Sequence, residues 1–345
     1  MSELIAIEQR QGSGDDSLWV REGESRLPGR DCNQRLDELH DGLARHSGVR
    51  FEAADAVPAA VEATLSELHR GSYLQALRGV RAEDGELVLA DFAPPGLEPD
   101  IPVTVGLVEA AHEAARTAIA AAQRLLGGAR FAYAVCRPPG HHAGPDWMAG
   151  YCYLNSAAAA AQTLRRGGLT PVGILDLDLH YPNGTSALAE RMPDVTLHSL
   201  HAAPVTNLPP GERLPRVEGE RAVAFAECPD HAGYLDEVAV SVEMLAEDAA
   251  ALVVSLGFDT VAGDPHGGWD FPPEIFTEIG ALLAASDLPV CVVQEGGYAL
   301  PTLSDCAYAF ACGLLEPSRG SFWPQGDQKE PRDAQADVRS IGVAR

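Results

Sequence analysis

Short runs of apolar and β-branched residues alternate with long segments in which apolar residues recur every three or four positions. The runs have the length of buried strands, and the segments have the period of amphipathic helices. This alternation predicts βα units, and therefore a parallel β-sheet flanked by helices on both faces. We expect strands at Phe131 to Cys136, Val172 to Leu179, Val195 to Leu200, Ala251 to Gly257 and Pro289 to Gln294. We expect helices at Thr104 to Leu126, Asn155 to Arg166, Tyr234 to Ala249, Pro273 to Ala285 and Thr302 to Leu315.

The chain shows no long linker before about Glu316, after which its composition turns polar. We therefore expect one α/β domain over residues 1–315 and a polar C-terminal tail over residues 316–345. Hydrophobic residues make up 46% of the 345 residues, which is enough for a large core. This composition excludes a disordered chain and a small disulfide scaffold.

The formal net charge is −25, from 50 acidic and 25 basic residues. Such an excess of negative charge disfavours nucleic-acid binding, which depends on neutralising phosphates. It would attract cationic molecules, although a need for solubility alone also accounts for the composition. We find neither an export signal nor 18 consecutive apolar residues, so no membrane partner is expected. The seven cysteines are scattered without a Cys-x-x-Cys motif, which is typical of reduced thiols in the cytoplasm.

Polar residues occur at or just after the end of each expected strand, where a buried sheet would not select them. Ligands of open parallel sheets bind beyond the carboxyl ends of the strands, so these residues are expected to line one crevice. The five clusters are Arg137 to His142, Asp176 to His180, Ser199 to His201, Asp259, and Glu295 to Tyr298.

Asp176, Asp178 and His180 occupy alternate positions, which in an extended chain would place them on one face. Two carboxylates so close together repel each other unless a cation lies between them, and an imidazole adds a nitrogen ligand. The apolar residues between them, Leu177 and Leu179, argue against a solvated strand end. The pattern therefore indicates a divalent metal site.

A mononuclear hydrolytic zinc site uses three protein ligands and leaves one position open. Asp259 ends another apolar strand and is the natural third ligand, whereas the nearby Asp264 is followed by proline and is typical of a turn or a helix cap. The predicted ligands are thus Asp178, His180 and Asp259, with Asp176 outside the set. Iron or cobalt could replace zinc at such a site.

Two adjacent histidines, His141 and His142, follow a Pro-Pro-Gly turn. In a catalytic pocket one imidazole can accept a proton while the other carries a positive charge. Each ring needs a hydrogen-bond acceptor at its second nitrogen to set its tautomer, and Asp176 and Asn183 are the candidates. A surface pair is the ordinary alternative, but the other clusters favour a common pocket. Tyr298 follows two glycines and could polarise a substrate carbonyl, or could be a buried tyrosine with an ordinary hydrogen bond.

These motifs resemble the histone deacetylase and acetylpolyamine amidohydrolase family, which shares the arginase-like α/β fold, and most of all its bacterial class II-like members. Six segments match in the family's order between residues 137 and 298: RPPGHHA, GYCYLN, ILDLDLHYPNGT, SLH, GFDTVAGDP and QEGGY. Weaker similarity, which includes Arg35 and the segment from Glu67 to Leu77, extends over nearly the whole chain.

The resemblance implies zinc bound by Asp178, His180 and Asp259. It implies that His142 is the general base and then the general acid, that His141 paired with Asp176 is its electrostatic partner, and that Tyr298 binds the acyl oxygen. It also implies a structural potassium ion held by Asp176, Asp178, Ser199 and the backbone carbonyls of His180 and Leu200. Gly150 and Tyr151 would line the acyl tunnel, and His266 would stand at its gatekeeping position.

The chain departs from the family pattern at several places. Tyr181 and Pro182 follow the zinc histidine where relatives have His-Gly, and Asn183 replaces an aspartate. Residues 201–230 replace the usual glycine-rich loop, and we find no second tunnel aromatic there. His266 is neither an acidic, polyamine-selecting residue nor an apolar one.

The resemblance implies an amidohydrolase that removes an acetyl group from a small N-acyl amine such as an acetylpolyamine. A protein lysine deacetylase and a deacylase of an unusual natural product are the alternatives within this class. A non-hydrolytic binding module is disfavoured by the complete ligand set, and a dinuclear manganese site lacks its extra aspartates. A homo-oligomer is compatible with the sequence.

Overall fold

The computed structural model describes residues 3–9, 15–23, 25–203 and 220–317. They form an eight-stranded sheet with the order β4-β1-β5-β10-β9-β6-β7-β8, and neighbouring strands are parallel. The strands are β1 (Leu4–Glu8), β4 (Val49–Ala53), β5 (Phe131–Val135), β6 (Val172–Asp176), β7 (Val195–Ala202), β8 (Arg221–Phe225), β9 (Ala251–Leu256) and β10 (Val290–Gln294). The structure confirms the predicted parallel α/β fold.

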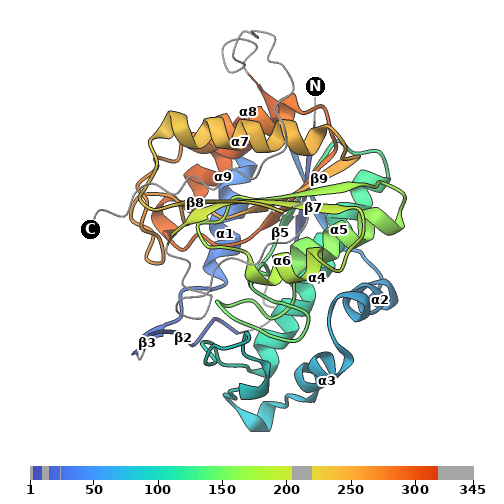
Figure 1. Ribbon diagram of the computed structural model, residues 1–345, viewed down its shortest axis with the longest axis vertical. Coiled ribbons are helices and arrows are strands. Elements are labelled where there is room, and N and C mark those ends of the chain that lie inside the picture. Colours follow the sequence, from blue (N-terminus) through green and yellow to red (C-terminus); the bar gives the residue numbers. More distant parts are fainter. Residues whose placement is uncertain (1–2, 10–14, 24, 204–219, 318–345) are drawn as a thin grey trace, which may run out of the picture.

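Helices cover both faces of this sheet (Figure 1). One face carries α1 (Gln34–Ala44), α7 (His231–Ala246), α8 (Ile275–Ala285) and α9 (Leu300–Leu315). The other carries α2 (Pro58–Leu68), α3 (Gly71–Gly79), α4 (Val105–Leu126), α5 (Ser156–Arg166) and α6 (Asn183–Ala189). Strand side chains alternate between the two apolar cores, because successive residues of a strand point to opposite faces. In β5, Ala132 and Ala134 face one core, and Phe131 and Tyr133 face the other.

The five expected strands and five expected helices are present, with shifted ends. Thr104 and Asn155 cap α4 and α5 with their side chains and are not part of the helices themselves. The sequence patterns missed three strands, β1, β4 and β8. The inner strand β1 is buried but only five residues long, whereas β4 and β8 form the two edges of the sheet and are only partly buried. Edge strands bury less apolar surface, so the signal that identifies a central strand is weak in them.

A small antiparallel hairpin of β2 (Trp19–Glu22) and β3 (Ser25–Pro28) lies outside the main sheet. Short 3₁₀ turns occur at η1 (Ala82–Asp84) and η2 (Ala90–Phe92). Of the predicted tail, only Glu316 and Pro317 fall within the described residues, and positions 204–219 of the unusual loop fall outside them. A search of the described part of the chain found no helix with the length and hydropathy needed to cross a membrane.

Glycines allow close contact between the helices that cover one face. A Cβ atom added at Gly313 in α9 would overlap the carbonyl oxygen of Thr277 in α8, and one added at Gly42 in α1 would overlap the carbonyl oxygen of Ser304. The backbones of these helices therefore pack together without a side chain between them.

We expect Gly313→Ala to lower the free energy of unfolding by about 1–3 kcal/mol, because one of the packed helices must move away. Gly79→Ala in α3 is the matched control, since a Cβ atom there would meet nothing within 4 Å. Urea denaturation followed by circular dichroism measures both variants. Equal stability of the two would show that this helix contact is not tightly packed.

Candidate active site

The carboxyl ends of the four central strands, β5, β10, β9 and β6, lead into the predicted functional residues. A cavity of about 580 Å³ opens there. Its wall contains nine residues of the predicted site: His141, His142, Gly150, Tyr151, Asp178, His180, Asp259, His266 and Tyr298. The remaining four, Asp176, Asn183, Ser199 and Leu200, do not line the cavity.

Asp178, His180 and Asp259 each offer a ligand atom, and these atoms lie within 4.8 Å of one another. The imidazole Nδ1 of His180 is 3.2 Å from Oδ1 of Asp178 and 3.1 Å from Oδ2 of Asp259. The prediction that Asp176, Asp178 and His180 share one face of a strand is wrong, because β6 ends at Asp176. The turn that follows β6 brings the last two toward Asp259.

This donor set fits a divalent cation. Both carboxylates are almost fully buried, and burial together with the neighbouring Asp178 raises the pKa of Asp259 to about 7. Gly257 and Gly296 leave room around the carboxylate oxygens, since a Cβ atom at Gly296 would lie 2.6 Å from Oδ2 of Asp178. Two oxygen ligands and one nitrogen ligand facing an open cavity match a three-ligand catalytic metal site.

His141 and His142 lie side by side, with ring centroids 4.0 Å apart, but have different partners. The Nδ1 atom of His141 lies 3.3 Å from Oδ2 of Asp176, and Nδ1 of His142 lies 2.9 Å from Oδ1 of Asn183. Burial opposes a charge on His141, but the carboxylates of Asp178 and Asp176 outweigh it and raise the pKa of His141 to about 10. Burial, and then the charge of His141, lowers the pKa of His142 well below its usual value. The pair thus combines a cationic and a neutral imidazole.

The part of the cavity wall beside this histidine pair is tightly packed. Gly150 adopts a φ of +53°, and a Cβ atom there would lie 2.5 Å from Cδ2 of His142. Tyr151 also has a positive φ, +69°, and its hydroxyl lies 2.8 Å from Nε2 of His266. The rings of Tyr151, His266 and Tyr298 lie with centroids 5.0–5.5 Å apart. They form an aromatic wall opposite the carboxylates.

Asp264 has the capping role that the sequence indicated. Its Oδ2 accepts hydrogen bonds from the backbone N–H groups of Tyr298 and Ala299, and its Oδ1 accepts one from the N–H of His266. A single carboxylate thereby fixes the backbone at two residues of the aromatic wall.

The residues predicted to bind potassium lie at the ends of β6 and β7. Asp176 is paired with Ser199 across the two strands, and its Oδ1 accepts the N–H of Asp178. Ser199 Oγ lies 2.9 Å from Nδ1 of His201, and Leu200 is fully buried. Potassium at this position stays a prediction.

Tyr181, one of the residues that differ from the family pattern, belongs to a largely buried polar cluster. The Tyr181 hydroxyl lies 2.9 Å from both Ser186 Oγ and Glu220 Oε1, and its ring packs against His201 with centroids 5.0 Å apart. Ser186 belongs to α6, and so does Asn183. The cluster therefore holds the helix whose first residue orients His142.

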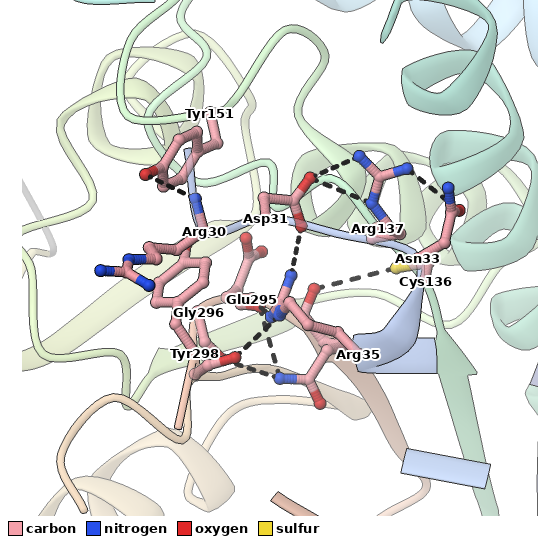
Figure 2. Close-up of polar contacts among 12 residues, drawn as sticks. Arg30, Asp31, Asn33, Arg35, Cys136, Arg137, Tyr151, Glu295, Gly296 and Tyr298 are labelled. Carbon is pink, nitrogen blue, oxygen red and sulfur yellow. Dashed lines mark hydrogen bonds and ion pairs between the residues drawn. The ribbon is translucent and has the colours of Figure 1, made fainter. Parts of the chain in front are cut away.

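The sequence patterns did not identify a buried ion network next to the cavity (Figure 2). Asp31 lies between Arg35 and Arg137, at 2.6 Å from Nη1 of the first and 2.7 Å from Nη2 of the second, and all three side chains are fully buried. Arg35 also donates to the carbonyl oxygens of Glu295 and Gly297, and its guanidinium lies 4.7 Å from the ring centroid of Tyr298. Although burial opposes it, the charge of the two arginines lowers the pKa of Asp31.

The mouth of the cavity contains further residues that no motif indicated. Val20 and Arg21 come from the hairpin, and Glu98 and Asp100 come from the segment before α4. Asp100 accepts a hydrogen bond from the N–H of Gly150, and burial raises its pKa to about 6. The mouth therefore carries both acidic and basic groups.

Comparison with known proteins gives a consistent result. The model of the histone deacetylase domain matches residues 30–314. The chain is 34% identical to acetylpolyamine amidohydrolase 1 of Pseudomonas aeruginosa over 277 residues, which cover 69% of this chain and 79% of that relative. It is 36% identical to the acetylpolyamine amidohydrolase of Burkholderia pseudomallei over 255 residues, which cover 69% of this chain and 70% of that relative.

Two further comparisons extend this result. A crystal structure of acetylpolyamine aminohydrolase from Burkholderia pseudomallei matches with a TM-score of 0.79 and 27% identity, over 92% of this chain and 99% of that chain. Histone deacetylase 8 of Arabidopsis thaliana is 30% identical over 318 residues, which cover 82% of this chain and 78% of that relative. These relatives are amidohydrolases and deacetylases, which are hydrolases that act on amide bonds.

We expect Asp31→Asn to lower the free energy of unfolding by about 3–5 kcal/mol, because it leaves two buried guanidinium groups without a counter-charge. Asp305→Asn is the matched control, since the Arg45–Asp305 pair has the same 2.6 Å separation but is exposed. Its loss should cost less than about 1 kcal/mol. Chemical denaturation checks both values, and similar losses in the two variants would contradict the importance of burial.

Proposed function

The chain belongs to the histone deacetylase family, and from this premise we propose that it is a zinc-dependent amidohydrolase that deacetylates a small N-acyl amine such as an acetylpolyamine. One observation carries the proposal: a three-residue metal-ligand set, a pair of histidines and a tyrosine border the same cavity. The family model covers nearly all of residues 1–315, which supports treating them as one catalytic domain.

Asp178, His180 and Asp259 would hold the zinc ion. When bound, zinc supplies a Lewis acid that polarises the acyl carbonyl and lowers the pKa of water toward about 7. Fe²⁺ and Co²⁺ suit the same donors. Asp176, Asp178, Ser199 and the carbonyls of His180 and Leu200 would hold a structural potassium ion.

His142 is suited to act as the base. Its Nδ1 faces the amide oxygen of Asn183, so the proton of the neutral ring lies on Nδ1 and leaves Nε2 to accept a proton from the attacking water. His142 then passes this proton to the leaving amine. The charge of His141, paired with Asp176, stabilises the negative charge that develops, and the Tyr298 hydroxyl donates a hydrogen bond to the oxyanion. The products are a carboxylate and a free amine.

Two observations support a small, cationic amine as the substrate. The excess of acidic residues attracts cations, and Glu98 and Asp100 line the cavity, as does the basic Arg21. Relatives with 34–36% identity are named acetylpolyamine amidohydrolases. The hydrogen-bonded Tyr151 and His266 would form the wall along which the acyl chain lies.

A protein acetyl-lysine deacetylase is the second candidate. The 30% identity to Histone deacetylase 8 of Arabidopsis thaliana favours it, and that match covers more of this chain than the acetylpolyamine amidohydrolase matches do. The two candidate functions use the same chemistry and differ in the part of the substrate that lies outside the tunnel.

We expect the purified, zinc-loaded protein to release acetate from acetylputrescine and acetylspermidine faster than from an acetyl-lysine peptide. Asp259→Asn should lose both bound zinc and acetate release, because the amide replaces an anionic ligand. Asp305→Asn, an exposed aspartate outside the site, should retain both. Preference for the peptide would favour the second candidate, and no acetate from any of the three substrates would contradict the proposed function.

We expect Tyr298→Phe to lower kcat by about 10²–10³-fold, the usual effect of losing one oxyanion donor, while zinc content stays unchanged. Tyr153→Phe is the control, because Tyr153 is also buried but its hydroxyl donates to the carbonyl of Pro102, and neither of these residues lines the cavity. Steady-state kinetics and metal analysis test both variants. An unchanged kcat in Tyr298→Phe would leave Tyr298 with a packing role only.

A further inference from the structure

Glu295 is a fully buried carboxylate that the proposed reaction does not use. It follows β10 directly. Its Oε2 accepts hydrogen bonds from the backbone N–H of Gly140 at 2.6 Å and of His141 at 3.1 Å, and its Oε1 lies 3.3 Å from Ser255 Oγ. One side chain therefore joins the ends of β9 and β10 to the loop that carries the histidine pair.

This loop, residues 137–142, is confined from the other side as well. A Cβ atom at Gly140 would lie 2.6 Å from the backbone nitrogen of Ser156 and 2.9 Å from the carbonyl oxygen of Leu154. The turn therefore lies between the start of α5 and the Glu295 carboxylate. A change on the Glu295 side alters the position of both imidazoles.

The backbone of Glu295 is anchored separately. Its carbonyl oxygen accepts a hydrogen bond from Nη2 of Arg35, and the Nε of the same arginine donates to the carbonyl of Gly297, next to Tyr298 (Figure 2). Main-chain contacts thus fix the segment that carries Tyr298, and the Glu295 side chain fixes the segment that carries the histidines.

Burying a carboxylate at this position costs free energy of folding. Burial raises the pKa of Glu295 to about 7, the charge of His141 opposes this rise, the nearby Asp176 adds to it, and the Gly140 N–H opposes it. An apolar side chain of similar size would avoid this cost but would leave the two N–H groups of the histidine loop without their acceptor. The hydrogen bonds to the loop are what the carboxylate adds.

We propose that Glu295 is a positioning residue that sets the separation between the His141–His142 pair and Tyr298. The inference rests on the proposed function, in which His142 moves the proton and Tyr298 stabilises the oxyanion. A displacement of about 1 Å between such groups can lower a rate by about 10²-fold without weakening substrate binding.

Two substitutions separate hydrogen bonding from charge. Glu295→Gln keeps an oxygen that can accept both N–H groups and presents its NH₂ to Ser255, so we expect kcat within about threefold of the wild type. Glu295→Ala removes the acceptor, so we expect kcat to fall by about 10²-fold with little change in KM. Tyr153→Phe is the control: it removes a buried hydrogen bond to the carbonyl of Pro102, which does not touch the histidine loop, and should leave kcat unchanged.

Hydrogen–deuterium exchange of the Gly140 and His141 amides gives a readout that needs no turnover. Both amides should be protected in the wild type and in Glu295→Gln, and should exchange at least about tenfold faster in Glu295→Ala. If Glu295→Ala does not fold, Glu295→Asp, whose shorter side chain cannot span the same distance, takes its place.

Three results would overturn the inference: unchanged exchange in Glu295→Ala, an unchanged kcat in that variant, or an equal loss in Glu295→Gln. Failure of the proposed function is a separate result, seen as absence of acetate release by the wild type while the exchange pattern still depends on residue 295.

Discussion

The Asp31 carboxylate, shared between Arg35 and Arg137, is the contact on which the rest of the site depends. Arg137 begins the loop that carries the histidine pair, and Arg35 holds the carbonyls that precede Tyr298. Because the three charges are fully buried, none of them can exchange its partner for water. The network therefore fixes two segments of the candidate active site, which are more than 150 residues apart in sequence, relative to the short segment before α1.

Several carboxylates lie buried in and behind the cavity wall, where a protein core normally excludes charge. Asp176, Asp178 and Asp259 are buried together, and the first two raise the pKa of His141 to about 10 although burial opposes this. The glycines at 257 and 296 leave space where side chains would otherwise separate the carboxylates. Such an arrangement favours a cation among the oxygens, which links the polar residues at the strand ends to the proposed metal-dependent chemistry.

The sequence predicts five of the six inner strands, most of which are apolar runs followed by polar residues at the functional edge, and it misses the inner strand β1. It predicts the edge strands poorly, since β8 buries only part of its surface. The three predicted metal ligands lie together in the structure, although the expected strand face was wrong. Asp31 and Glu295 have partners 106 and 155 residues away, so no local spacing indicates these two contacts, although Glu295 belongs to a polar cluster that the sequence predicted to line the crevice. Contacts formed only by the fold cannot be identified from one sequence.

The adjacent imidazoles of His141 and His142 differ in pKa because their hydrogen-bond partners differ. A carboxylate beside His141 favours the cation, whereas the neutral amide of Asn183 fixes the tautomer of His142 without adding charge. An aspartate at 183 would favour protonation of His142 and reduce the fraction able to accept a proton. The replacement of His-Gly by Tyr181 and Pro182 serves the same end, because the Tyr181 cluster anchors α6 and thereby the Asn183 amide. The orientation of the His142 ring thus depends on contacts that extend from Asn183 through α6 to the Tyr181 cluster.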